Sequence, residues 1–158
     1  MLFRSGCNPH QKFARISIDG EPAPLRVLNG TPGYINLLDA LGAWPLAREL
    51  KEATGKAGAA SFKHTSPAGA AIDRPLGEGF RASQFLPEDE ELSPVARAYA
   101  RARGGDRMSS FGDMAAVSEV VDVSLANVLR REVSDGIIAP GYEPEALAIL
   151  GGKKGGRF

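Results

Sequence analysis

The sequence predicts an α/β protein in which one mixed sheet carries helices on both of its faces. Segments with strand character alternate with segments of helical period, in the order strand, strand, helix, strand, helix, helix, strand, helix, strand, helix. Such alternation is typical of a sheet that is covered by helices on both sides. The 158 residues, 43% of them hydrophobic and 24% charged, suffice for one domain with one core.

Two strands and a long helix are expected in the first third of the chain. Apolar and polar residues alternate over 13–19, which is the period of a strand. A second short strand over 25–28 would allow a hairpin across 20–24. Residues 35–53 have helical period, and their apolar stripe consists of residues 37, 38, 41, 44, 47, 48 and 50. Pro45 removes a hydrogen bond inside this helix, so we expect a kink at 41–42 or two helices.

An irregular segment and a second helix are expected in the middle of the chain. Residues 73–92 contain glycines, prolines and an acidic run that is interpreted as solvated surface. Ser93-Pro94 is a helix-start signal, and Gly104-Gly105 ends the helix. The arginines of this helix are expected on its solvent-facing side; they are Arg97, Arg101 and Arg103.

The last third of the chain is expected to alternate between strands and helices. An apolar segment at 114–121 precedes a helix over 125–132, for which Ser124 is the expected cap. A short buried strand at 136–140 and a helix over 144–150 follow. The basic tail at 153–158 is expected to be frayed.

The chain is organised around a stretch in which an apolar segment, 57–62, ends in Lys63 and His64. We interpret this stretch as a buried strand, a tight turn and the start of a helix, with Ser66 as its cap and Pro67 in its first turn. Ligand sites of α/β sheets lie at the carboxyl ends of strands, and a helix start there would attract an anion.

Lys63 and His64 form a chemically reasonable pair. Histidine has an ordinary pKa of about 6.5, and a neighbouring cation disfavours its protonation, so His64 is suited to act as a base. Lys63 can stabilise an oxyanion. Adjacent strand residues point to opposite faces, so both can serve one site only if the strand has ended at Lys63. The alternative is an exposed lysine beside a hydrogen-bonded histidine.

Composition excludes several classes of function. Nineteen basic residues balance nineteen acidic ones, so nothing indicates a surface for nucleic acid or an anionic membrane. Cys7 is the only cysteine, which excludes an internal disulfide and a cysteine-based zinc site. No apolar run approaches the roughly 20 residues of a membrane span, and no signal-peptide core is seen, so we expect a cytoplasmic protein.

Five stretches carry the motifs of a known family in the same order. They are FRSGCNPHQ at 3–11, YINLLDAL at 34–41, KHTSPAG at 63–69, AYARARGGDRMSSFGD at 98–113 and REVSDGIIAPGY at 131–142. Together they resemble the formyltransferase domain of the bifunctional purine biosynthesis enzyme AICAR transformylase/IMP cyclohydrolase. The resemblance covers nearly the whole chain. It implies that residues 1–158 are the first, cytidine-deaminase-like subdomain of the transformylase region, without the cyclohydrolase domain or the second transferase subdomain.

The resemblance also implies a reaction and its residues. A formyl group would pass from the co-substrate 10-formyltetrahydrofolate to the amine of the AICAR nucleotide, with His64 as base and Lys63 stabilising the oxyanion. Arg4, Ser5, Gly112 and Asp135 would hold the nucleotide. Ser5 stands where the family has tyrosine and offers only a hydroxyl. Without the family, Arg4 would be an exposed terminal residue, and Gly112 and Asp135 turn residues. The zinc ligands of cytidine deaminases are missing, so no metal is expected.

Three interpretations of the chain remain open at this point. It is one half of a split enzyme, completed as a homodimer or by a complementary transferase half; it is a non-catalytic nucleotide-binding module; or it is an inert remnant that pairs with a full-length subunit. Turnover, nucleotide binding without turnover, and co-purification without nucleotide binding would distinguish them.

Overall fold

A computed structural model describes residues 2–5, 10, 12–15, 17 and 25–158, with side chains at residues 10, 17 and 25–158. At the N-terminus, β1 (Leu2–Ser5) pairs with β2 (Lys12–Arg15) in an antiparallel sheet. β2 covers the start of the strand expected over 13–19, whose end lies outside the described residues, as does the hairpin across 20–24. The prediction of a strand over 25–28 is wrong, because these residues have no regular secondary structure. Val27 and Leu28 are 37% and 43% exposed, and a short apolar run becomes a strand only where another strand pairs with it.

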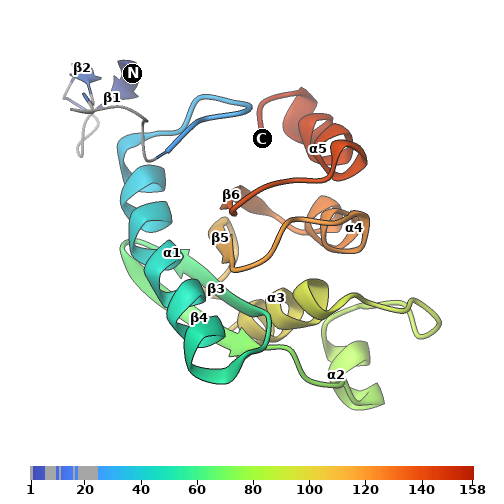
Figure 1. Ribbon diagram of the computed structural model, residues 1–158. Helices are drawn as coiled ribbons and strands as arrows, with labels where there is room; N and C mark the ends of the chain where they lie inside the picture. Colours follow the sequence, from blue (N-terminus) through green and yellow to red (C-terminus); the bar gives the residue numbers. More distant parts are fainter. Residues whose placement is uncertain (1, 6–9, 11, 16, 18–24) are drawn as a thin grey trace.

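The main sheet has four strands in the order β4-β3-β5-β6 (Figure 1). They are β3 (Gly58–Lys63), β4 (Ser66–Ile72), β5 (Asp113–Val117) and β6 (Ser134–Ile138). β3 is antiparallel to β4 and to β5, whereas β5 and β6 are parallel. The predicted mixed sheet is therefore confirmed.

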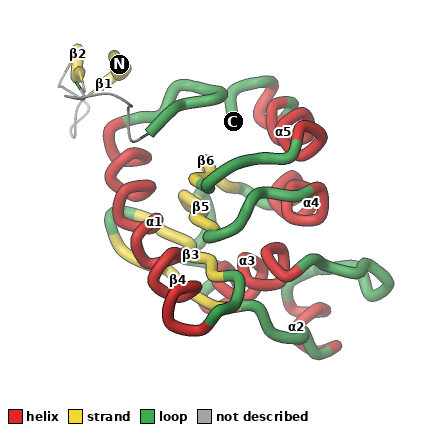
Figure 2. The backbone as a smooth tube through the Cα atoms, viewed as in Figure 1, coloured by secondary structure: helices red, strands yellow, loops and turns green. Residues whose placement is uncertain are grey.

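Helices cover both faces of this sheet, as predicted (Figures 1 and 2). One face carries α1 (Tyr34–Thr54), and the other carries α3 (Pro94–Gly105), α4 (Val123–Arg131) and α5 (Pro144–Gly151). The short helix α2 (Glu78–Ser83) interrupts the segment expected to be irregular. The larger core cluster, which includes Tyr99, lies on the side of α3 to α5, and a smaller one lies under α1. Among the described helices, none has the length and apolar character needed to cross a membrane.

Helix α1 confirms the predicted helix, but only part of the expected apolar face, Leu37 and Ala47 among it, is buried. Its buried apolar positions on the sheet side are Leu37, Ala40, Ala43 and Ala47, whereas Leu38 and Leu41 are 37% and 50% exposed. Small residues are needed because the helix lies very close to the sheet: a Cβ added to Gly58 would lie 2.6 Å from the carbonyl oxygen of Ala47.

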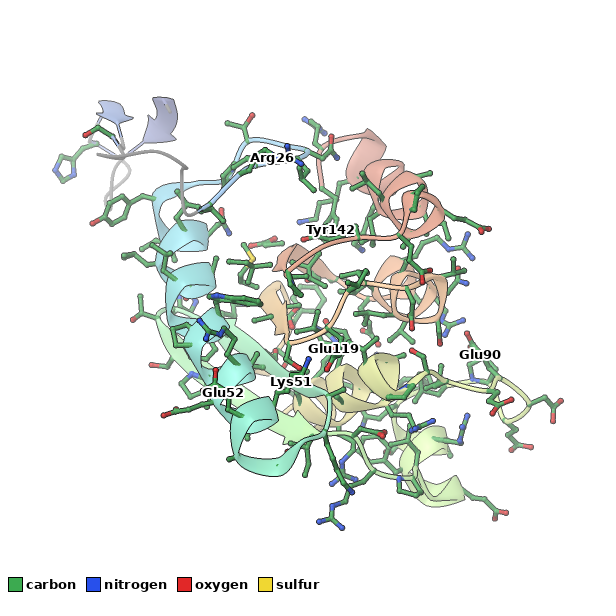
Figure 3. All side chains as sticks on the ribbon, in the orientation of Figure 1. Arg26, Lys51, Glu52, Glu90, Glu119 and Tyr142 are labelled. Carbon is green, nitrogen blue, oxygen red and sulfur yellow. The ribbon has the colours of Figure 1, made fainter. Side chains whose placement is uncertain are left out.

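The division of α1 into two helices is also wrong, because the helix runs through Pro45 without a break. Pro45 and Leu41 both lie on the exposed side, so water can reach the carbonyl group that the proline leaves without a partner. At its far end, Lys51 lies 2.8 Å from Glu119, which ties the helix to the segment after β5 (Figure 3).

The prediction that a helix begins at Ser66 is wrong. Residues 66–72 instead form strand β4, which pairs with β3 as a β-hairpin. His64 and Thr65 between them have φ angles of +53° and +65°, the left-handed conformation of a two-residue hairpin turn. Pro67 is tolerated because β4 is an edge strand. The predicted anion site at a helix start does not exist here.

Close packing between β4 and α3 explains why this strand consists of small residues. A Cβ added to Gly69 would lie 2.0 Å from the carbonyl oxygen of Ala102. Alanine has high helix propensity and low strand propensity, so the alanines and the Ser66-Pro67 start signal favour a helix over the strand that packing requires.

Two further expectations are corrected, one at the start of α4 and one in the C-terminal tail. The cap of α4 is Asp122, whose Oδ1 accepts from Leu125 N at 2.8 Å, and Ser124 instead accepts from Ser93 N. The tail is not frayed, since η1 (Lys153–Gly155) forms there and the carbonyl oxygen of Phe158 accepts from Asn29 Nδ2 at 2.7 Å. The cap Ser93 and the termination of α3 near Gly105 are confirmed.

Candidate functional site

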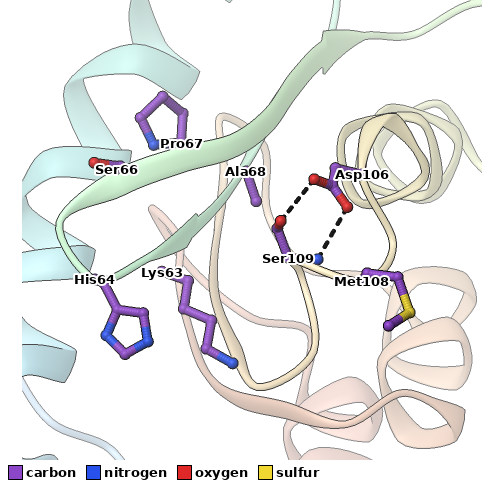
Figure 4. A pocket seen from close by; sticks show the side chains of 8 residues that line it. All are labelled: Lys63, His64, Ser66, Pro67, Ala68, Asp106, Met108 and Ser109. Atoms are coloured by element: carbon purple, nitrogen blue, oxygen red, sulfur yellow. Dashed lines mark hydrogen bonds between the residues drawn. The ribbon is translucent and has the colours of Figure 1, made fainter.

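The candidate site lies at the edge of the sheet where β3 ends and β4, β5 and β6 begin. A hollow of about 410 Å³ opens there (Figure 4). It is lined by Lys63, His64, Ser66, Pro67, Ala68, Asp106, Met108 and Ser109. The hollow therefore lies at the carboxyl end of β3, where a site was expected, and it also borders the amino end of β4.

Lys63 and His64 meet the geometric condition for serving one site. β3 ends at Lys63, and His64 belongs to the turn. In Figure 4 both side chains extend to the same side of the hairpin end. Lys63 is half-buried and His64 is exposed to solvent. A cation and an imidazole are therefore presented side by side at the mouth of the hollow.

The lysine is held by the loop that precedes β5. Its Nζ donates a hydrogen bond to the carbonyl oxygen of Phe111 and lies 5.9 Å from the centre of the Phe111 ring. Gly112 follows with a φ of +78°, and a Cβ added there would lie 3.4 Å from Lys63 Nζ. The structure thus brings together two of the predicted site residues, Lys63 and Gly112.

The turn that carries His64 is held from α1 by Asp39, a residue that sequence reasoning did not assign to the site. Asp39 is 4% exposed, and its Oδ1 accepts from the backbone N of Thr65 at 2.6 Å. The hydroxyl of Thr65 donates to the carbonyl oxygen of His64 at 2.7 Å. The available signal was a carboxylate between the apolar residues Leu38 and Ala40 of the motif at 34–41.

Asp135 lies at the same edge of the sheet, linked to the turn through α1. Asn36 Nδ2 lies 3.5 Å from Asp135 Oδ2. Asn36 precedes Asp39 by three residues, so these two residues of α1 lie on one helix face with their Cβ atoms about 5–6 Å apart. The carboxylate of Asp135 also accepts from Lys154 Nζ at 2.8 Å. Asp135 therefore lies near the His64 turn but is engaged by the C-terminal segment.

A buried ion pair lies beside the loop that holds Lys63. Arg103 Nη1 donates to Asp113 Oδ1 at 2.9 Å, with the side chains 3% and 0% exposed. Ser61 and Tyr99 hydroxyls also donate to this carboxylate, at 2.7 and 3.1 Å. Burial raises the pKa of Asp113, while the hydrogen bond from Ser61 and the charge of Arg103 oppose that rise. The expectation that Arg103 faces solvent is wrong.

Arg103 fixes the loop by bonding its backbone as well. Nη1 donates to the carbonyl oxygen of Ser110 at 2.6 Å and Nη2 to that of Val133 at 3.2 Å. The carbonyl of Val133 also accepts from Gly112 N at 2.9 Å. Because the same loop holds Lys63, the buried pair supports the cation of the site. A charged residue inside a helix gives no sequence signal for such a role.

The two predicted nucleotide ligands at the N-terminus are Arg4 and Ser5. Arg4 and Ser5 belong to β1, and their side chains lie outside the described residues. Within the described part of the chain, no three His, Cys, Asp or Glu side chains are close enough together to hold a metal ion.

Comparison with known proteins identifies the family. The sequence model of the AICARFT/IMPCHase bienzyme matches residues 1–158. The chain is 33% identical over 157 residues to the bifunctional purine biosynthesis protein PurH of Myxococcus xanthus, and 36% identical over 156 residues to that of Chloroflexus aurantiacus. These alignments cover 96% and 98% of the chain but only 26% of each relative. The chain spans about a quarter of the length of these relatives, and it belongs to the AICARFT/IMPCHase bienzyme family.

Proposed function

We propose that this chain contributes the base and the oxyanion-stabilising cation of a formyl transfer in purine biosynthesis. The formyl donor is 10-formyltetrahydrofolate, and the acceptor is the exocyclic amine of the AICAR nucleotide. The observation that carries the proposal is the placement of Lys63 and His64 on one side of the hairpin end, beside Gly112. The family and its purine biosynthesis relatives support the same reaction class.

The chemistry assigns a role to each side chain. The amine attacks the formyl carbon, a C–N bond forms, and the carbonyl oxygen becomes an oxyanion. The imidazole of His64 takes the proton that the attacking amine loses. Lys63 Nζ has three N–H donors, one of which binds the carbonyl oxygen of Phe111, so others are free to bind the oxyanion. Collapse of the intermediate breaks the bond to N10 of the folate, which leaves with a proton.

Substrate binding is proposed for Gly112 and Asp135, with Arg4 and Ser5 as the remaining nucleotide ligands. Gly112 leaves room for close approach to the backbone, since a Cβ there would point at the lysine. Asp135 offers a carboxylate that can accept from ribose hydroxyls once Lys154 releases it. The folate would be held by a homodimer partner or by a complementary transferase half, because the hollow is open and several of its residues are exposed.

The test is formyl transfer by the purified chain with both substrates near saturation. We expect His64→Gln to lower kcat by about 100- to 10,000-fold and Lys63→Met by about 100- to 1,000-fold. Lys56→Met, an exposed lysine after α1, is the matched control and should retain full turnover. Near-normal turnover by His64→Gln would overturn the assignment of the base.

A second candidate function is nucleotide binding without catalysis. It is favoured by the openness of the site, since His64, Asp106, Met108 and Ser109 are exposed to water, which a formyl-transfer site has to exclude. Calorimetric titration with the nucleotide distinguishes the two. Binding without turnover by a folded chain would select this function. Absence of both, with co-purification of a full-length subunit, would select the remnant that pairs with such a subunit.

A further inference from the structure

The bond between Asp39 and the His64 turn has features that a simple helix–hairpin contact does not require. α1 faces the sheet mainly with alanines, and yet it buries this carboxylate to 4% exposure. A buried charge is costly unless it is hydrogen-bonded. The partner is the backbone N of Thr65 at 2.6 Å, the short distance typical of a charge-assisted hydrogen bond.

The turn that receives this bond is conformationally strained. His64 and Thr65 have φ angles of +53° and +65°; histidine tolerates this region better than most residues, whereas β-branched threonine does not. A non-glycine residue in the left-handed region costs about 1–2 kcal/mol, and β-branched threonine is especially unfavourable there. Such a conformation persists only where its surroundings hold it, and strained residues cluster at functional sites. The surroundings here are the Asp39 carboxylate and the hydroxyl of Thr65 on the carbonyl of His64.

We infer that Asp39 is a positioning residue that holds His64 in the left-handed turn and so keeps its imidazole beside Lys63. The inference rests on the proposed function for its catalytic meaning. Its structural content is independent: without the carboxylate, the turn loses the bond that fixes the N–H of Thr65, and the hairpin end relaxes toward a less strained conformation. His64 then moves away from the side of the hairpin on which Lys63 lies.

NMR on the whole chain tests the structural content directly. The chain has only two histidines, so the Cε1–Hε1 region contains one signal from His64 and one from His10, assigned with His64→Gln. We expect Asp39→Ala to shift or broaden the His64 signal and leave that of His10 in place. Asp39→Asn keeps an oxygen acceptor at the same position and should retain most of the wild-type His64 shift.

Asp122→Ala is the matched control. Asp122 Oδ1 also accepts from a backbone N, that of Leu125 at 2.8 Å, but at the start of α4 away from the turn. It should cost comparable stability, about 1 kcal/mol, and leave the His64 signal unchanged. If Asp39 had a purely structural role, Asp39→Ala would lower stability and leave the His64 signal unchanged, as Asp122→Ala does. An unmoved His64 signal in folded Asp39→Ala therefore overturns the inference.

A measurement on the unmodified chain covers the case in which Asp39→Ala does not fold. The amide proton of Thr65 should resonate far downfield and exchange slowly, because it is bonded to a buried carboxylate, and Asp39→Asn should move it upfield. Rapid exchange of this amide in the wild-type chain would contradict the inference.

Turnover separates this inference from the proposed function. Asp39→Ala should lower kcat by about 100-fold, the effect of a displaced catalytic group, with little change in the KM for the nucleotide. If Asp39→Ala shifts the His64 signal while the wild-type chain itself shows no turnover, the positioning is supported and the proposed function is contradicted. A loss of turnover without any shift of His64 would overturn the positioning.

Discussion

Arg103 and Asp113 form an ion pair 2.9 Å long in the interior, directly beneath the loop that carries Phe111 and Gly112. The guanidinium binds two backbone carbonyls as well as the carboxylate, and Asp113 receives two further hydroxyl donors. Arg103 Nε lies 3.0 Å from Glu132 without the alignment of a hydrogen bond. The loop that holds Lys63 is thus supported by a buried polar network.

Removing one partner of this pair should destabilise the chain strongly. Arg103→Met leaves the Asp113 carboxylate buried without its counter-charge, and the free energy of unfolding should fall by about 3–5 kcal/mol. Urea denaturation measures the change. The control is Arg48→Ala, which removes an exposed i,i+4 pair with Glu52 and should change stability by no more than about 0.5 kcal/mol. Equal effects of the two variants would contradict a structural role for the buried pair.

Alanine substitutions should change stability in opposite directions at Gly69, in the contact between β4 and α3, and at Gly79, outside it. Gly69→Ala places a methyl group 2.0 Å from the backbone oxygen of Ala102, so the sheet and helix have to separate, at a cost of about 3 kcal/mol or more. Gly79→Ala in α2 meets no atom within 4 Å and should stabilise the chain by up to about 1 kcal/mol through helix propensity. Thermal unfolding of both variants is the measurement. A tolerated Gly69→Ala would show that β4 does not pack as described.

The pair between Lys154 and Asp135 predicts competition with the nucleotide. Both side chains are partly exposed, 36% and 46%, so the pair is screened and contributes no more than about 1 kcal/mol. Lys154→Met should therefore raise nucleotide affinity by about two- to fivefold, as measured by calorimetry. Lys56→Met is the control that changes net charge equally and should leave the Kd unaltered. Weaker binding by Lys154→Met would mean that the lysine itself holds the ligand.

Local signals in the sequence predicted most of the fold. The helical period of α1, the Ser93 cap and Pro94 of α3, and the alternation of strands and helices from β5 to α5 follow from short-range patterns. The errors arise where distant contacts decide. The small residues of 66–72 allow this segment to pack as a strand closely against α3, a contact that the local sequence does not indicate. Helix α1 likewise lies so close to the sheet that small alanines, rather than the larger leucines, occupy most of its buried positions.

The same division applies to the site. The placement of Lys63 and His64 at the end of a buried strand could be predicted, because the apolar segment that precedes them ends there. Asp39 and Arg103 could not, since a charged residue in a helix is usually exposed, and only the folded chain shows that these two are buried. Their partners, Thr65 and Asp113, lie 26 and 10 residues away in the sequence.

Alkaline pH should weaken the fold through Tyr142. Burial raises the pKa of this phenol to about 12 in the folded chain, where its hydroxyl donates to the carbonyl oxygen of Ile137. In the unfolded chain the phenol ionises near pH 10. Between these values the folded state keeps a proton that the unfolded state has released, so the free energy of unfolding falls as pH rises from about 10 to about 12.

The loss assigned to Tyr142 is measurable as a difference between two pH values. At pH 11 it amounts to about 1.4 kcal/mol relative to pH 8. Tyr142→Phe removes the ionisable group, so its stability should fall less between pH 8 and pH 11 than that of the wild type, by about that amount. Tyr99, whose pKa burial raises as well, should contribute to the decrease that remains. Because the phenylalanine variant also loses the bond to Ile137, only the pH-dependent difference is diagnostic, and an equal decrease in both proteins would contradict the assignment to Tyr142.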